Sequence, residues 1–127
     1  MGAFQLKSVT TGKCLQWNGL NKAITLATCK EKYSQYWATY GTQIASLENN
    51  LGGYCFGTAK SMEKAPVGRA CYQAPGLRGN DLRYNHKTYL ASAGLGWPTC
   101  YIKVVSGKAK CGKRTSDLKY MKWVVMA

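Results

Sequence analysis

The chain has 127 residues and a formal net charge of +13, and 46% of its residues are hydrophobic. This length predicts one domain spanning residues 1–127, and the apolar and aromatic content excludes a disordered tail. No stretch approaches the roughly 18 uncharged apolar residues of a membrane-spanning helix, so no such helix is predicted.

The chain opens without the apolar run of a signal peptide, because Lys7 interrupts it at once. Either the protein is intracellular or its mature form lies behind an added Met1. Residues 23–29 alternate apolar and polar side chains, which is typical of a half-buried strand. Gly, Asn, Thr and Ser recur every few residues along the chain. We therefore expect short strands joined by turns, with no helix and no linker.

Three weak repeats divide the chain at about residues 4–50, 51–94 and 95–127. Each opens with a turn, a cysteine and an apolar or aromatic residue. The openings are Gly12-Lys13-Cys14-Leu15, Gly53-Tyr54-Cys55-Phe56 and Pro98-Thr99-Cys100-Tyr101. The first repeat ends with Gln35-Tyr36-Trp37, whereas the others carry Asp81-Leu82-Arg83-Tyr84 and Asp117-Leu118-Lys119-Tyr120.

Six cysteines stand at positions with no C-x-x-C spacing: Cys14, Cys29, Cys55, Cys71, Cys100 and Cys111. Several pairings are open, but pairs taken in order lie 15, 16 and 11 residues apart, each within one repeat. An even count in a small basic chain favours disulfides and secretion, with six reduced cytosolic thiols as the alternative. The wide spacing and the single His86 do not make a zinc site, so we expect neither metal nor cofactor.

These repeats, with Gly-x-Cys-apolar near the start and Gln-x-Trp near the end, resemble the ricin-B-like β-trefoil family. The resemblance covers nearly the whole chain and is strongest in the first repeat. It implies an all-β fold of three repeats, in which twelve strands form a six-stranded barrel capped by three hairpins. Trp37 and Trp123 would then be core residues, and each repeat would hold one disulfide.

The same resemblance implies carbohydrate binding without catalysis, at a carboxylate, a stacking aromatic and an amide in each repeat. The carboxylate follows the Cys-apolar pair, where this chain has Gln16, Gly57 and Ile102. The aromatic precedes the second cysteine, where the chain has Ala27, Arg69 and Ala109, and the amide position of the first repeat holds Ser34. We therefore expect the family's galactose-type site to be absent from all three repeats.

Other side chains offer alternative binding surfaces. Gln16, Trp17 and Asn18 put an aromatic among amides in a loop, which is a candidate sugar platform. The chain has nine tyrosines, and the eight other than Tyr54 are too many for one core, so some of them must reach the surface. The third repeat carries +6 of the net charge, and its candidate anion contacts are Lys108, Lys110, Lys113, Arg114 and Lys119.

An enzyme is not predicted, because one histidine and five scattered carboxylates offer no acid–base pair. We expect a secreted, non-enzymatic module, its signal peptide missing from this sequence, that binds a glycan or glycoprotein. It would act as a lectin or as the targeting subunit of a larger toxin or enzyme, with a partner protein. The alternatives are a polyanion site for acidic glycan or, less favoured, nucleic acid in the third repeat, and a protease inhibitor presenting Lys113-Arg114-Thr115.

Overall fold

The computed structural model describes residues 2–41, 43–48, 53–58, 63–72, 91–92, 100–113 and 116–126. Within them the chain forms eleven short strands and two 3-10 helices, η1 (Tyr33–Gln35) and η3 (Leu118–Met121). The strands are β1 (Gln5–Ser8), β2 (Cys14–Gln16), β3 (Thr25–Ala27), β4 (Trp37–Tyr40), β5 (Gln43–Ser46), β6 (Tyr54–Gly57), β7 (Val67–Ala70), β8 (Ala91–Ser92), β9 (Cys100–Val105), β10 (Lys108–Gly112) and β11 (Trp123–Met126). No helix in the described ranges is long and apolar enough to cross a membrane.

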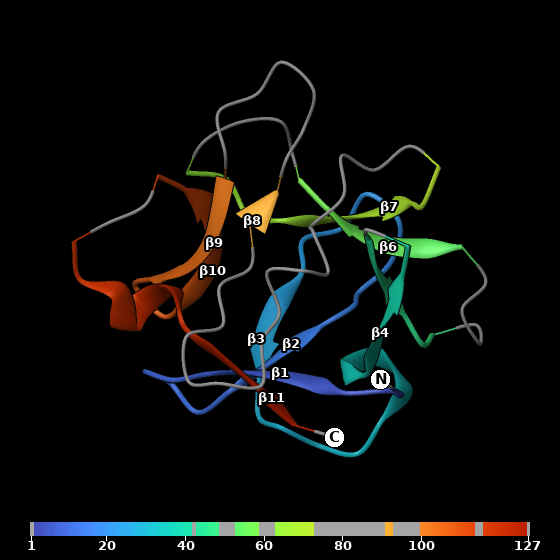
Figure 1. The fold of residues 1–127 in the computed structure, drawn as a ribbon, viewed down its shortest axis with the longest axis horizontal. Coiled ribbons are helices and arrows are strands. Elements are labelled where there is room, and N and C mark those ends of the chain that lie inside the picture. Colours follow the sequence, from blue (N-terminus) through green and yellow to red (C-terminus); the bar gives the residue numbers. More distant parts are fainter. Residues whose placement is uncertain are drawn as a thin grey trace.

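The strands form three antiparallel sheets, in the orders β11-β1-β2-β3, β4-β5-β6-β7 and β10-β9-β8 (Figure 1). The last strand closes onto the first, with Gln5 opposite Met126. Phe4 and Trp37 exchange backbone hydrogen bonds of 2.9 and 2.8 Å, which join the first sheet to the second. Strands distant in sequence are thus neighbours, as closure of a sheet requires.

The β9–β10 hairpin illustrates how the local sequence sets the strands. Its two-residue turn, Ser106 and Gly107, has φ values of 51° and 76°, and two left-handed residues give the twist that such a hairpin needs. Residues 102, 104, 109 and 111 point into the core, whereas their neighbours face outward. This alternation fixes the register of the hairpin.

The core gathers the large apolar side chains of all three repeats, including Leu15, Phe56 and Ile102, which are fully buried. Trp37 and Trp123 are also fully or almost fully buried, as predicted, and the Trp37 ring packs against Phe56. The disulfides are Cys14–Cys29, Cys55–Cys71 and Cys100–Cys111, with Cα–Cα distances of 5.0, 4.8 and 5.3 Å. The predicted pairing, one disulfide in each repeat, is confirmed.

The first and third repeats use the same tryptophan contact. The Trp37 indole donates a 3.3 Å hydrogen bond to the Leu15 carbonyl, and the Trp123 indole donates a 3.0 Å bond to the Ile102 carbonyl. Each tryptophan directly follows a 3-10 helix and one extended residue. Leu15 and Ile102 are therefore equivalent positions.

This equivalence corrects the predicted end of the third repeat. Asp117-Leu118-Lys119 does not stand where the first repeat has Gln35-Tyr36-Trp37, because Asp117 caps η3 and the next two residues begin that helix. Met121, Lys122 and Trp123 occupy that position instead, and Met121 is the last residue of η3. The comparable segment of the second repeat, Asp81-Leu82-Arg83-Tyr84, lies outside the described residues.

A loop of the first repeat is held against β7 of the second. Gly68 donates to the Lys22 carbonyl at 3.0 Å and accepts from the Asn21 amide at 2.8 Å. Trp17 lies over the same glycine and stacks on Tyr54 with ring centroids 5.1 Å apart. Gly68 is therefore a point of close contact between the first and second repeats.

We predict that Gly68→Ala destabilises the protein by about 1–3 kcal/mol, since overpacking a tight contact shifts backbone and rings. An added Cβ would lie 2.6 Å from the Trp17 ring and would also meet the Gly19 carbonyl. Chemical denaturation would measure the loss, with Gly2→Ala as the control, because a Cβ there meets nothing within 4 Å. Equal stability of the two variants would contradict the close approach at Gly68.

Candidate functional site

Strand register identifies the side chains at the positions that the resemblance assigns to a sugar site. Leu15 pairs with Leu26, Phe56 with Gly68 and Ile102 with Cys111. The carboxylate position directly follows the first residue of each pair, and the aromatic position directly follows the second. The carboxylate positions are Gln16, Gly57 and Lys103, and the aromatic positions are Ala27, Arg69 and Gly112.

Two predicted positions of the third repeat are therefore wrong. Ile102 and Ala109 are buried core residues at 0% and 2% exposure, so neither reaches a surface site. Cys100 lies two residues before the apolar position, whereas Cys14 lies one residue before it. Counting from the cysteine consequently misplaces the third repeat. None of the three residues at the carboxylate positions set by register, Gln16, Gly57 and Lys103, is a carboxylate.

In the second repeat an arginine fills the space at the family position. A Cβ on Gly57 would lie 2.5 Å from Arg69 Cγ, so the arginine stem rests directly on the glycine. Its guanidinium donates to the Asn21 side-chain oxygen and, at 3.5 Å, to the Thr58 carbonyl. A ligand at this position would have to displace the arginine.

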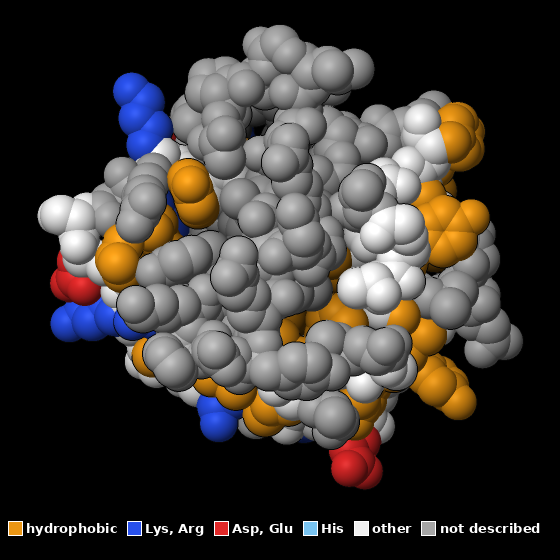
Figure 2. All heavy atoms as spheres, viewed as in Figure 1, with side chains coloured by type: hydrophobic (Ala, Val, Ile, Leu, Met, Phe, Trp, Pro, Cys, Tyr) orange, Lys and Arg blue, Asp and Glu red, His pale blue; other side chains and the backbone are white. Residues whose placement is uncertain are grey.

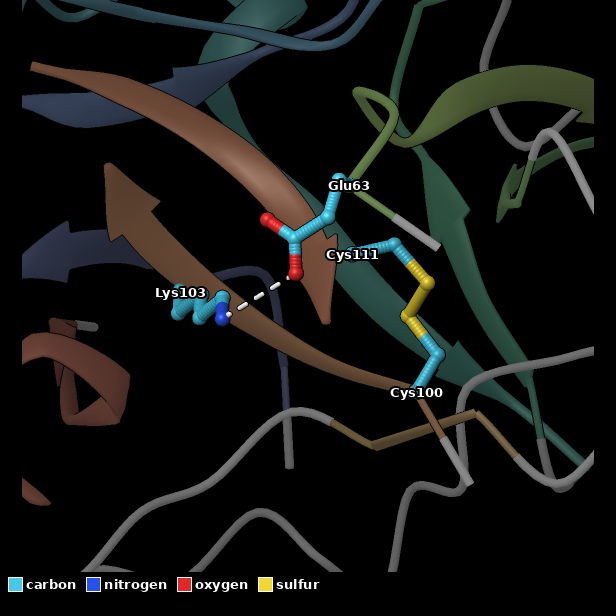
Figure 3. A network of polar contacts seen from close by, with 4 residues as sticks. All are labelled: Glu63, Cys100, Lys103 and Cys111. Carbon is cyan, nitrogen blue, oxygen red and sulfur yellow. Dashed lines mark ion pairs between the residues drawn. A yellow bond between two sulfur atoms is a disulfide. The ribbon is translucent and has the colours of Figure 1, made fainter. Parts of the chain in front are cut away.

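The third repeat fills its own position in the same way. A Cβ on Gly112 would lie 2.7 Å from Lys103 Nζ, and the Lys103 ammonium forms a 3.4 Å ion pair with Glu63 (Figure 3). The Glu63 amide donates to the Cys111 carbonyl at 2.6 Å, and the Cys111 amide donates to the Lys64 carbonyl at 2.8 Å. A segment of the second repeat is thus fixed across this position, beside the Cys100–Cys111 disulfide.

The first repeat does not offer the predicted aromatic platform. Trp17 is only 5% exposed, and its ring is stacked on Tyr54 inside the core cluster. The prediction of an exposed stacking face at Trp17 is therefore wrong. Gln16 accepts a 3.1 Å hydrogen bond from Gln35 and donates one of 2.9 Å to Asn18, which in turn donates to Thr25. These amides stabilise the hairpin loop, although Asn18 itself is exposed.

A surface groove lies instead beside η1. It has a volume of about 710 Å³ and is lined by Ala3, Glu31, Lys32, Tyr33, Tyr36 and Leu47. Tyr33 is 70% exposed, and Tyr36 is half-buried on the other side of Gln35. The Leu47 amide donates to the Tyr36 carbonyl at 3.0 Å, which holds the groove wall in place. We call this feature the η1 groove.

The η1 groove combines the groups that polar ring-shaped ligands require. The tyrosine faces can stack on an apolar ring face, the Glu31 carboxylate can accept hydroxyl hydrogen bonds and the Lys32 ammonium can donate them. One signal of the groove is visible in the sequence, namely a pair of tyrosines three residues apart around Gln35. Ala3 and Leu47 were missed because they come from segments far apart in the chain.

The predicted anion contacts are only partly brought together. Lys108 and Lys113 are exposed and Lys110 is half-buried, all on or beside β10. Lys119 lies on η3, 3.8 Å from the Asp117 carboxylate, with its ammonium 5.2 Å from the Tyr120 ring centroid. Arg114, and with it the predicted inhibitor segment, lies outside the described residues. Lys and Arg side chains project on the side of the molecule where β9, β10 and η3 lie (Figure 2).

No family model and no curated protein matches the chain. Solved structures do match. A designed 3-fold symmetric protein, ThreeFoil, has a TM-score of 0.69 and 10% identity over 100% of this chain and 99% of its own. The C-half of an earthworm R-type lectin, solved with GalNAc, has a TM-score of 0.67 and 14% identity over 99% of this chain and 98% of its own.

A third similar structure is a non-toxic homologue of type II RIPs from bitter gourd, Momordica charantia, in complex with α-methyl-D-galactoside. It has a TM-score of 0.72 and 19% identity, and the match covers 99% of this chain but 48% of that protein. These likenesses extend over the whole chain, and they confirm the predicted ricin-B-like β-trefoil fold. At such identities the likeness concerns the fold.

Proposed function

We propose that the protein is a non-enzymatic carbohydrate-binding module that holds a neutral sugar in the η1 groove. The observation that carries the proposal is the groove itself, whose lining combines Tyr33 and Tyr36 with the Glu31 carboxylate and the Lys32 ammonium group. Two structures of the same fold were solved with a sugar, α-methyl-D-galactoside in one and GalNAc in the other, which supports carbohydrate as the ligand class.

The positions at which ricin-B-like proteins bind sugar are occupied by side chains of this protein, so we place the sugar site elsewhere. Arg69 lies on Gly57 and Lys103 lies on Gly112, so both positions are filled by the protein's own cations. Gln16 is bonded to two other amides. The η1 groove is open and carries an exposed aromatic face, which makes it the better candidate.

We further propose that the module is secreted and serves as a targeting unit, alone or with a partner subunit. Three disulfides persist in an oxidising compartment and are rare in the cytosol. The bitter-gourd protein offers a precedent in architecture, since the part that this chain matches is 48% of that longer chain. Mass spectrometry of the protein isolated from its source, before and after reduction, would test the oxidised state, and an unchanged mass would contradict secretion.

We predict that Tyr33→Ala weakens binding to a neutral glycan at least about tenfold, because ring stacking contributes roughly 0.5–1.5 kcal/mol beyond the area it buries. The measurement is a glycan array followed by calorimetry with the best neutral ligand, at low and moderate salt. Tyr72→Ala is the matched control, since this tyrosine is 87% exposed but lies at the end of β7.

Neutral-sugar binding that survives both salt and Tyr72→Ala but not Tyr33→Ala would support the η1 groove. Binding that Tyr33→Ala leaves unchanged would contradict the groove as the site. An array without any neutral ligand would contradict carbohydrate recognition of this kind altogether.

A further inference from the structure

The outer face of the β9–β10 hairpin gathers lysines from both of its strands. Lys103 on β9 stands directly opposite Lys110 on β10. Lys110 is half-buried, and the Lys103 side chain is 12% exposed. Lys108 follows on the same face, because side chains two residues apart on a strand point the same way. We call Lys103, Lys108 and Lys110 the hairpin lysines.

The hairpin lysines place positive charges side by side with few carboxylates to neutralise them. Like charges directly opposite each other on neighbouring strands destabilise a sheet. Glu63 pairs with Lys103, but no carboxylate in the described residues pairs with Lys108, Lys110 or the adjacent Lys113. Lys64 lies in the same region, since its carbonyl accepts from the Cys111 amide. The face therefore carries a surplus of positive charge that an added anion would relieve.

The face is also rigid. A disulfide links Cys100 to Cys111 across the hairpin, and residues 63 and 64 bond to the Cys111 backbone on its open side. The inward residues Ile102, Val104 and Ala109 are anchored in the core. The cations thus lie on a fixed backbone, which lowers the ordering entropy that binding costs.

We infer that the hairpin lysines form a second binding site, separate from the η1 groove, for an anionic polysaccharide with sulfate groups along its chain. Lysine ammonium groups act as point charges toward sulfate or phosphate oxygens. A sulfated polysaccharide suits the face better than single-stranded nucleic acid, which binds by stacking its bases on aromatic side chains. The aromatic residue of this face in the described hairpin is Tyr101, and it is half-buried beside Gly112.

The test measures binding of heparin, as a sulfated polysaccharide, by the intact chain between about 50 and 200 mM salt. The double variant Lys108→Gln/Lys110→Gln is compared with Lys13→Gln/Lys30→Gln, which removes the same charge at exposed positions outside the hairpin. We expect the hairpin variant to lose at least about tenfold in heparin affinity. Its affinity should also depend less steeply on salt, because binding through fewer lysines releases fewer counterions. The control variant should keep most of both.

A fold control accompanies the binding data. Lys110→Gln should raise the melting temperature of the free protein, because it removes the like-charge pair with Lys103, and should reduce the stabilisation by heparin. Equal heparin affinity in the hairpin and control variants would overturn the inference. Tighter binding of single-stranded DNA than of heparin would overturn it too, by making the face a nucleic-acid site. Tyr33→Ala should leave heparin binding intact, so the failure of this site and of the η1 groove are distinguishable.

Discussion

Trp17→Ala is expected to destabilise the protein by about 3–5 kcal/mol, the usual cost of removing a buried tryptophan from a core. Trp17 is 5% exposed, stacks on Tyr54 with an interplanar angle of 10° and covers Gly68 of the neighbouring repeat. Its removal opens a cavity between two repeats and frees the loop that they share. A small domain has only about 5–15 kcal/mol of stability in total, so much of the population should unfold on mild heating.

The measurement is denaturant unfolding followed by tryptophan fluorescence and circular dichroism, with Tyr33→Ala as the comparison. Tyr33 is a large aromatic residue as well, but it is 70% exposed, so its removal should change stability little. The two variants should therefore separate: one loses stability and the other loses sugar binding. A Trp17→Ala protein that keeps its stability but loses neutral-sugar binding would instead restore the exposed platform predicted from the sequence.

The sequence was sufficient for the fold because the features that fix it are local and chemical. Cysteine pairs within each repeat, the Trp37 and Trp123 core positions and the recurrent Cys-apolar openings all follow the chain order. Such features survive a change in loop length. The strand predicted over residues 23–29 was right only in part, since β3 spans Thr25–Ala27.

Positions that depend on pairing register were not predictable from the cysteines. The third repeat carries Cys100 one residue earlier, relative to its core residue Ile102, than the first repeat carries Cys14 relative to Leu15. A shift of one residue moves a strand side chain to the opposite face. Lys103 and Gly112 therefore stand where Ile102 and Ala109 were expected, and only the hairpin register distinguishes them.

The η1 groove could not be predicted from the sequence for a related reason. Its tyrosines lie three residues apart in the chain, but Ala3 and Leu47 come from distant segments, before β1 and directly after β5. The burial of Trp17 likewise depends on β6 and β7 of the next repeat. Contacts between repeats leave no periodic pattern in either partner.

Gln35 and Met121 occupy equivalent, fully buried positions at the ends of η1 and η3, two residues before a buried tryptophan. The Gln35 amide makes four hydrogen bonds. Its oxygen accepts from the Lys30 amide at 2.8 Å and from Gln5 at 3.2 Å. Its nitrogen donates to the Thr28 carbonyl at 3.0 Å and to Gln16 at 3.1 Å.

Gln35→Met should therefore cost about 3 kcal/mol, although the third repeat accommodates methionine at this position. Methionine has a similar length but no hydrogen-bonding amide, so the Lys30 amide and the Thr28 carbonyl would lose this partner, and each such buried loss costs roughly 1–3 kcal/mol. The reciprocal Met121→Gln should also destabilise, because it would place a polar amide at a fully buried position. Denaturant unfolding of both variants and of the double exchange measures the effect. If Gln35→Met left the free energy of unfolding unchanged, the four hydrogen bonds would contribute no net stability. Side-chain shape alone would then explain why glutamine and methionine occupy equivalent positions in two repeats.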